Sequence, residues 1–189
     1  MATVAVLVGS LRKESFNRKM ATALIALQGP SLQAEIVEIG QLPLYNQDGD
    51  DLRDPPKAWT EFRERVKAFD AVLWVTPEYN RSVPGVLKNA IDVGSRPYGK
   101  SVWTGKPCAV VSVSPGALGG FGANQHIRQS FVFLNMPCMQ QPEAYIGGAA
   151  AFFDATGQLS NDATREFARK FMQSFAEWVK RTGTSPARA

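Results

Sequence analysis

The sequence predicts an α/β protein built on a parallel sheet. Short, almost purely apolar runs recur along the chain, as expected for strands that are buried on both faces. Segments with apolar residues at spacings of three and four separate these runs, which is the periodicity of amphipathic helices. Five strands that alternate with helices in this way require right-handed crossover connections. No linker of distinct composition interrupts the 189 residues, so we expect one domain over 1–189.

The five expected strands are not equally clear. Three are continuous apolar runs, at 3–8, 71–75 and 107–113. The second strand in chain order, 34–39, shows a looser alternation. The fifth falls somewhere in 136–145, where two prolines interrupt the pattern.

Caps and apolar periodicity mark the expected helices. They cover 16–27, 55–69, 84–93, 123–135 and a last segment from 160 to 179. On the second helix, Trp59, Phe62, Val66 and Phe69 share the inward face, while Arg63, Glu64 and Lys67 are predicted to face outward. The segment 46–54 reads as a polar loop, and the tail after Gly183 is expected to fray.

Composition excludes several classes of protein. Hydrophobic residues make up 44% and charged residues 20%, which is typical of a globular domain rather than a disordered chain. The net charge of +4 accompanies no long basic run, so we expect no nucleic-acid partner. No apolar run is long enough to span a membrane. The two cysteines lie far apart in the sequence, which favours reduced thiols and a cytoplasmic location.

We expect a flavodoxin-like three-layer sandwich with the strand order 2-1-3-4-5. In such folds, ligands bind beyond the carboxyl ends of the strands, where the order switches between the first and third strands. The three segments that follow the first, third and fourth strands are therefore the places to look for a site.

The first of these segments offers groups that bind a phosphate. Ser10, Arg12, Ser15 and Asn17 supply hydroxyl, guanidinium and amide donors, directly before a helix whose first N–H groups are unpaired. The segment is neither a dinucleotide fingerprint nor a Walker loop. The alternative is an ordinary capped helix with an exposed arginine.

The other two segments could form the walls of the same site. In 76–85, two prolines stiffen a turn that carries Tyr79, a suitable wall for a planar heterocycle, although a rigid polar loop is the alternative. In 114–120, glycines allow the backbone to approach a ligand, with a flexible turn as the alternative.

Three motifs make the chain resemble a known family. They are GSLRKESFN at 9–17, TPEYNRSVPGVLKNAID at 76–92 and GKPCAVVSVSPGALGG at 105–120. With them, the chain is similar over most of its length to the NADPH-dependent FMN reductases, particularly the bacterial chromate, quinone and azo-dye reductases. This resemblance implies an FMN cofactor, reduction by NADPH or NADH, and ping-pong transfer from FMN N5 to quinones, azo compounds, chromate or free flavin.

The resemblance also implies roles for individual residues. The FMN phosphate would be held by Ser10, Arg12, Ser15 and Asn17. One edge of the isoalloxazine ring would be bordered, largely through backbone atoms, by Pro77, Glu78, Tyr79 and Asn80. The other edge of the ring would be lined by Ser114, Gly116 and Gly119. No catalytic acid or base is expected, because the flavin carries the chemistry. A homodimer or homotetramer is the implied assembly.

Several polar residues have two interpretations. Arg81 could meet the phosphates of the nicotinamide nucleotide or be a solvated charge. Arg128 and Glu143 could form a charge pair at a subunit contact or be separate surface charges. His126 is expected at the surface or an interface, and Cys108 is expected to be a buried inert thiol, while the role of Cys138 stays open.

Two other functions remain possible at this point. The chain could be a flavin-binding electron carrier that docks on a protein and does not turn over pyridine nucleotides. Its basic net charge does not favour this function, because a carrier is expected to have a concentrated acidic face for docking. It could also be a phosphate-binding α/β protein without flavin.

Overall fold

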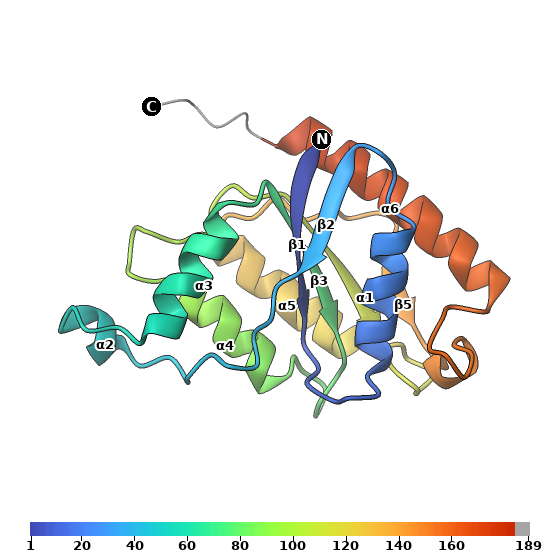
Figure 1. Cartoon of the computed structure of the whole chain (residues 1–189), viewed down its shortest axis with the longest axis horizontal. Helices are drawn as coiled ribbons and strands as arrows, with labels where there is room; N and C mark the ends of the chain where they lie inside the picture. The colour runs from blue at the N-terminus through green and yellow to red at the C-terminus, as the bar shows by residue number, and fades with distance from the viewer. Residues whose placement is uncertain (184–189) are drawn as a thin grey trace.

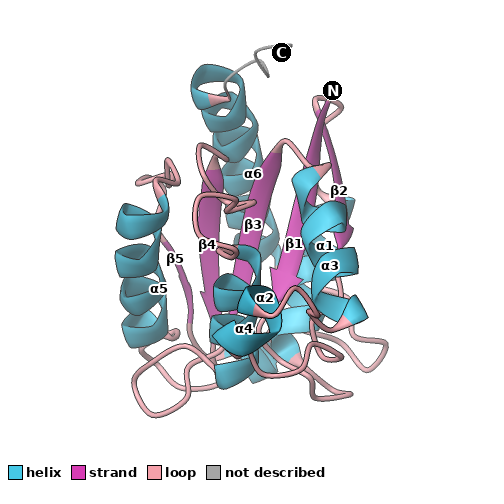
Figure 2. Ribbon diagram, turned by 90° about the vertical axis from the view of Figure 1, so that its left-hand side faces the viewer, coloured by secondary structure: helices cyan, strands magenta, loops and turns pink. Residues whose placement is uncertain are grey.

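The computed structural model describes residues 1–183, so the tail that was expected to fray lies outside the described residues. Within 1–183, five strands form one parallel sheet in the order β2-β1-β3-β4-β5. The strands are β1 (Ala2–Val8), β2 (Leu32–Ile36), β3 (Ala71–Thr76), β4 (Cys108–Val113) and β5 (Ala144–Ile146). Figure 2 shows this order across the sheet, with the strand arrows pointing to one common edge. The flavodoxin-like fold is confirmed.

Helices cover both faces of the sheet and complete the three layers (Figures 1 and 2). One face carries α1 (Phe16–Ala26) and α6 (Asp162–Thr182); the other carries α3 (Lys57–Lys67), α4 (Gly85–Gly94) and α5 (Phe121–Leu134). A short helix, α2 (Gln47–Asp51), precedes α3, and a 3-10 helix, η1 (Ala149–Ala151), follows β5. None of the helices in 1–183 has the length and apolar character needed to cross a membrane.

The strands are apolar throughout because both of their faces are buried. Successive side chains on β1 alternate between two cores: Val6 packs with α1 and α6, whereas Leu7 packs with the three helices opposite. Both side chains are fully buried. This two-sided burial explains why the strands lack the polar alternation of a half-exposed sheet.

Three strands match the sequence prediction to within one residue at each end, and two strands differ by more. β2 covers Leu32–Ile36 rather than 34–39. Its ladder with β1 begins at Leu32. After Val37 the chain leaves the sheet and packs in the core beneath α3, α4 and α5. β5 covers Ala144–Ile146, at the far end of the predicted segment. It begins only after Pro142, which has no N–H to donate to a ladder.

The segment 46–54 and Arg63 were predicted wrongly. The segment is not a plain loop, because it contains α2, with Asn46 capping the helix by accepting from the Asp48 N–H. Arg63 does not face outward, since only 7% of the residue is exposed. Its guanidinium donates two bonds of 2.8 Å to Asp50 of α2, and its Nε donates to the Val93 carbonyl at 2.8 Å. A buried ion pair thus fastens α2 to α3 and α4.

Candidate active site

The chain turns sharply at the end of β1 and enters α1. The Gly9 N–H continues the sheet by donating to the Val75 carbonyl at 2.8 Å, and a Cβ on Gly9 would lie only 3.1 Å from the Leu87 side chain. Ser15 caps α1, because its hydroxyl accepts from the Arg18 N–H at 3.3 Å. The N–H groups of Phe16 and Asn17, in the first turn of α1, have no partner within the helix. This loop therefore presents a helix N-terminus at the carboxyl edge of the sheet.

A cavity of about 220 Å³ lies at this edge, where the strand order switches between β1 and β3. Three separate loops, following β1, β3 and β4, form its walls. Of the residues predicted for the site, it brings together Ser10, Arg12, Ser15, Asn17, Pro77, Glu78, Tyr79 and Ser114. It is also lined by Phe16, Val113 and Pro115, which the prediction missed. All three could have been found, since Phe16 lies within the quoted first motif and Val113 and Pro115 lie within the third.

The polar groups in this cavity are mostly donors. Ser10, Ser15 and Asn17 are buried, whereas Arg12 is exposed at the mouth, and its guanidinium forms no ion pair or hydrogen bond with any other residue of 1–183. Helix α1 adds the partial positive charge of its N-terminus. The nearby Glu14 carboxylate does not offset these charges fully, because Lys19 pairs with it at 2.8 Å and thereby lowers the pKa of Glu14. The arrangement suits a bound anion.

Asn17 links the first loop to the third. Its Nδ2 donates to the Val113 carbonyl at 3.2 Å, and its Oδ1 is buried without a hydrogen-bond partner among the described residues. Buried polar atoms in native proteins nearly always have partners. An unpaired acceptor in the wall of a cavity is explained when a bound molecule supplies a hydroxyl or N–H donor. The predicted contact of Asn17 with a phosphate remains a prediction.

The second loop is a tight hairpin at the end of β3. Tyr79 and Ser82 exchange backbone hydrogen bonds of 3.0 and 2.9 Å, and the two residues between them, Asn80 and Arg81, have positive φ angles of 51° and 65°. Asparagine tolerates this left-handed conformation better than most residues. Asn80 does not line the cavity, and its conformation assigns it to the turn instead. Arg81 is exposed and approaches Glu78 at 3.6 Å, a surface contact of small energetic value.

Glu78 lines the cavity, and its carboxylate reaches α5. Its Oε2 accepts from the Ala123 N–H at 3.1 Å, in the first turn of α5. The N-cap of that helix, Gly120, has no side chain to perform this task. His126 of α5 adds a contact of 3.0 Å between Nδ1 and the Ser82 hydroxyl. The 77–82 loop is therefore held on the N-terminal half of α5, and His126 lies near the surface as expected.

The third loop follows β4 and uses its glycines for packing. Ser114 lines the cavity, and its hydroxyl accepts from the Gly116 N–H at 3.1 Å. Gly119 has a φ of 60°, and a Cβ there would lie 2.6 Å from the Tyr145 carbonyl carbon. Neither Gly116 nor Gly119 lines the cavity. Gly119 is required because β5 passes directly against it.

Arg128 and Glu143 do not contact each other within the described chain. Arg128 donates to the Asn124 side chain at 2.9 Å and to the Met139 carbonyl at 3.0 Å. Glu143 accepts from the Tyr145 hydroxyl at 2.5 Å. Each therefore has its own partners inside the protomer.

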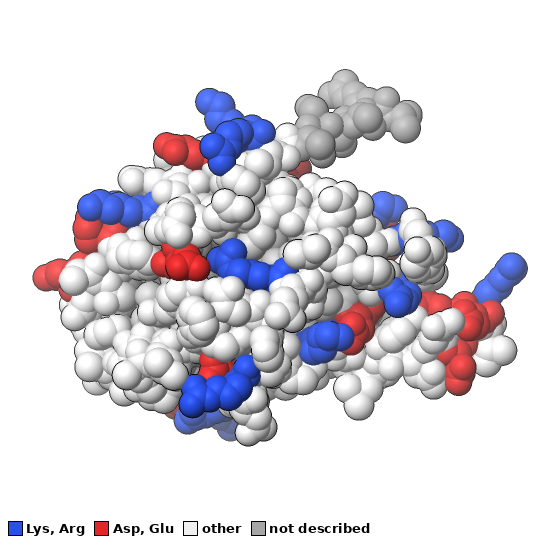
Figure 3. All heavy atoms as spheres, turned by 180° about the vertical axis from the view of Figure 1, so that it is seen from behind, with Lys and Arg blue, Asp and Glu red and all other residues white. Residues whose placement is uncertain are grey.

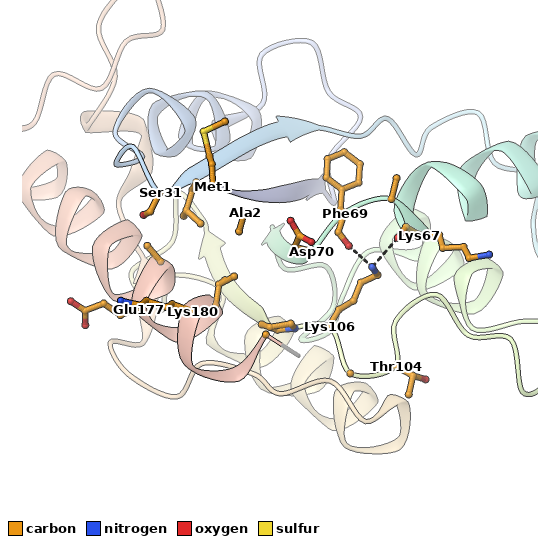
Figure 4. Close-up of a pocket in the computed structure, with 17 residues that line it drawn as sticks. Met1, Ala2, Ser31, Lys67, Phe69, Asp70, Thr104, Lys106, Glu177 and Lys180 are labelled. Carbon is orange, nitrogen blue, oxygen red and sulfur yellow. Dashed lines mark hydrogen bonds between the residues drawn. The ribbon is translucent and has the colours of Figure 1, made fainter. Parts of the chain in front are cut away.

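A larger hollow, of about 940 Å³, opens at the opposite, amino-terminal edge of the sheet (Figure 4). There the Lys106 ammonium donates to the carbonyls of Lys67 and Phe69, and burial lowers the pKa of Lys106. The lysine thus has partners already and closes the C-terminal end of α3. Ligands of parallel α/β sheets bind at the carboxyl edge. The smaller cavity is therefore the candidate active site.

Comparison with known proteins identifies the family. The family model of the NADPH-dependent FMN reductases matches residues 2–151. The chain belongs to this family. A quinone reductase from Pseudomonas putida is 67% identical over 178 residues, which cover 94% of this chain and 95% of that protein. A 2-hydroxy-1,4-benzoquinone reductase from Burkholderia sp is 45% identical over 177 residues, covering 94% of this chain and 96% of the relative.

Solved structures agree with this assignment. The chain superposes with a TM-score of 0.90 on FerB, a flavoenzyme NAD(P)H:(acceptor) oxidoreductase from Paracoccus denitrificans. The two are 40% identical, and the match covers 97% of this chain and all of the other. The expected oxidoreductase activity, with FMN as cofactor and NADPH or NADH as donor, is confirmed. The electron-carrier alternative is not favoured.

Proposed function

We propose that the cavity at the carboxyl edge binds FMN with the phosphate on the 10–17 loop. The main support for this proposal is that one cavity contains Ser10, Arg12, Ser15 and the N-terminus of α1. Each group alone suits an ordinary helix start, but together they form a set of donors for an oxyanion. The unpaired Asn17 Oδ1 fits the same ligand, because the ribityl chain of FMN carries hydroxyl donors.

The remaining walls would hold the ring. Pro77 and the backbone of Glu78 lie on one side of the cavity and Ser114 on another, with Tyr79 half exposed at the rim. We propose that Asn80 acts by shaping this loop, and Gly116 and Gly119 by setting the path of the third. When bound, FMN accepts hydride from NAD(P)H and passes electrons to an acceptor. The protein residues position the cofactor and supply no acid or base.

Titration of the apoprotein with FMN and with riboflavin tests the phosphate subsite. The two ligands share the ring and the ribityl chain and differ in the phosphate. We expect FMN to bind at least tenfold more tightly, because hydrogen bonds to a charged group contribute about 1.5–3 kcal/mol each. Quenching of flavin fluorescence measures both affinities. Equal affinities would show that the 10–17 loop does not recognise the phosphate.

We propose quinones as the main acceptors and azo compounds, chromate and free flavin as further ones. The quinone assignment rests on the names of the two relatives described above. Anaerobic addition of NADPH or NADH to the FMN-loaded protein should bleach the visible flavin band, and a quinone should restore it. Bleaching that a quinone cannot reverse would exclude quinones as acceptors. If neither nucleotide reduced the bound FMN, the result would favour the alternative function, a flavin-binding electron carrier.

The surface charge also fits a reductase better than a carrier. On the face shown in Figure 3, acidic and basic side chains are scattered among broad uncharged areas. Docking of a carrier on a protein is usually steered by a concentrated patch of one sign. On this face of residues 1–183, acidic side chains gather only at the right-hand end, where basic side chains lie beside them (Figure 3). Small acceptors that diffuse to an open cavity need no such patch.

Glu78 should matter for stability and for FMN retention together. We expect Glu78→Ala to lower the free energy of unfolding by about 0.5–2 kcal/mol, the usual contribution of a helix cap. FMN binding should weaken as well, because the 77–82 loop loses one of its two hydrogen-bond contacts with α5 in the described chain and keeps only that between Ser82 and His126. Glu78→Gln keeps an acceptor for the Ala123 N–H and should retain most of both. Thermal melts and FMN titrations measure the two effects, and an unchanged Tm in the alanine variant would contradict the capping role.

We propose a homodimer or homotetramer that uses the outward face of α5. Three large apolar residues of this helix are exposed, Phe121 at 52%, Val132 at 84% and Phe133 at 75%. Exposed apolar groups concentrated on one element indicate an interface. The double change Val132→Glu and Phe133→Glu should lower the mass measured by light scattering. Leu44→Glu changes a comparably exposed residue elsewhere and should leave the mass unaltered; a lower mass in both variants would argue against this face.

We further propose that the whole chain acts as one FMN-binding domain in the cytoplasm. The two hydrophobic cores lie on opposite faces of the same sheet. Cys108 and Cys138 are free thiols, as is usual in reducing compartments.

A further inference from the structure

The fold brings the two cysteines of the chain side by side. Cys108 is the first residue of β4, and Cys138 lies in the connection from α5 to β5. They occupy paired positions of a parallel bridge, with hydrogen bonds of 2.9 Å from the Cys108 N–H to the Pro137 carbonyl and 2.8 Å from the Met139 N–H to the Cys108 carbonyl. Paired residues on neighbouring strands are about 4.8 Å apart. Cα atoms joined by a disulfide are roughly 4.4–6.8 Å apart.

One N–H donor contacts these sulfur atoms, and a second, unpaired N–H is buried in the same core. The Arg128 Nη1 lies 3.2 Å from the Cys138 Sγ. The Trp74 indole N–H is buried and has no hydrogen-bond partner in the described part of the chain. Trp74 packs in the same core as Cys108, lies two residues beyond the register partner of Cys108 on β3, and acts to lower the pKa of the Cys108 thiol. A cation and an unpaired donor together favour a sulfur that carries negative charge or an oxygen atom.

The two thiols differ in reactivity. Hydrogen bonding from Cys108 and the charge of Arg128 lower the pKa of Cys138, while full burial raises the pKa of Cys108. Cys138 is also partly exposed, whereas Cys108 is fully buried. One cysteine thus has the features of an attacking thiolate, and its neighbour stays a protonated thiol.

We propose that Cys138 and Cys108 form a redox site that hydrogen peroxide converts to an intramolecular disulfide. The Cys138 thiolate attacks one oxygen of the peroxide, so that an S–O bond forms, the O–O bond breaks, and the departing hydroxide takes up a proton to become water. The Cys108 sulfur then attacks the Cys138 sulfenic acid, so that the S–S bond forms and the S–O bond breaks. The departing hydroxide takes the Cys108 thiol proton as a second water. Two thiols are oxidised by two electrons while one peroxide is reduced.

The site lies away from the proposed cofactor cavity. Cys108 begins β4 at the amino-terminal end, whereas the cavity touches the chain at Val113 and beyond. The disulfide would join β4 to the segment after α5 and close a loop of about 30 residues. We expect the oxidised protein to keep its FMN and to melt several degrees higher, because the closed loop restricts the unfolded chain.

Treatment of the FMN-loaded protein with a small molar excess of hydrogen peroxide tests the proposal. Both free thiols should disappear when titrated under denaturing conditions, the intact mass should fall by about 2 Da, and dithiothreitol should restore both values. Peptide mapping should find Cys108 linked to Cys138 within one chain. Thiols that persist while only methionines gain oxygen would overturn the proposal, and so would a bond between two chains.

Variants separate the roles of the two cysteines. Cys108→Ala should stop at the sulfenic acid, about 16 Da heavier and trapped by dimedone, whereas Cys138→Ala should not react. Arg128→Gln should slow disulfide formation about tenfold, because loss of the guanidinium removes a positive charge that favours the Cys138 thiolate. Arg169→Gln removes an exposed arginine of α6 and serves as the matched control. Equal rates in the two arginine variants would refute the role of Arg128. Whether the disulfide forms is tested by the mass of the wild-type protein, so this test stands even where a variant folds poorly.

Discussion

Replacing Asp50 with alanine is expected to lower the free energy of unfolding by about 3–5 kcal/mol, the largest effect of any single change predicted for this protein. The exposed fractions of the Arg63 and Asp50 side chains are 9% and 5%. Removal of the carboxylate would leave the guanidinium buried without a counter-charge. The Arg63 Nε would still donate to the Val93 carbonyl, which satisfies only part of the group.

The same change would loosen the segment between β2 and α3. Asp50 also accepts from the Tyr45 hydroxyl at 3.2 Å, and the Tyr45 ring packs against Trp59. We expect the Tm to fall by roughly 6–20 °C in a chain of this size. Thermal and urea melts of the FMN-free protein measure the effect without a contribution from cofactor binding.

Two controls separate the loss of an ion pair from the loss of side-chain volume. The double variant Arg63→Met and Asp50→Leu replaces the pair with apolar groups and should be more stable than Asp50→Ala, because no charge is left unpaired. Glu61→Ala removes one partner of the exposed Lys57–Glu61 pair and should change the unfolding free energy by less than about 1 kcal/mol. A similar loss in the Asp50 and Glu61 variants would refute the argument from burial.

Arg12→Ala should weaken FMN binding by about 10–100-fold and leave the Tm of the apoprotein nearly unchanged. A charge-assisted hydrogen bond contributes about 1.5–3 kcal/mol, which corresponds to this range of affinity. Arg12 is exposed and has no partner within 1–183, so the fold does not depend on it. Fluorescence titration of the apoprotein with FMN measures the change.

Lys13→Ala is the matched control for Arg12. Lys13 is exposed and has the same charge, but it does not line the cavity. Its loss should change FMN affinity by less than about threefold, the scale of a screened surface charge. Riboflavin affinity should be the same in the wild type and in Arg12→Ala. Unaltered FMN affinity in Arg12→Ala, or an equal loss for riboflavin, would contradict the phosphate assignment.

The layers of the fold were predictable because their signals are local. An uninterrupted apolar run such as the one ending at Val8 indicates a strand that is buried on both faces, and spacings of three and four indicate helices. Less regular segments were harder to place. The limits of β2 and β5 depend on which neighbouring strand offers a partner, and α2 is held to the rest of the fold by the pair of Asp50 with Arg63.

The sequence also predicted where the site lies. Parallel strands end at one edge, so the loops after β1, β3 and β4 had to meet there, and one cavity does contain residues of all three. What each residue does was less predictable. Glu78 caps a helix that begins far along the chain, and Gly119 makes room for β5. Such roles depend on contacts between distant segments.

The sequence by itself thus determined the α/β class, because alternating strands and helices follow from patterns within a few neighbouring residues. The strand order was expected from the fold type, and together with the ends of the parallel strands it indicated the edge of the sheet that carries the site. Only the tertiary structure decided which side chains meet. It buried Arg63 against Asp50, and it placed Cys138 beside a cysteine that the sequence had marked as inert. The physical reason is that burial and pairing are set by packing between elements, and a local pattern contains no information about the partner that packing supplies.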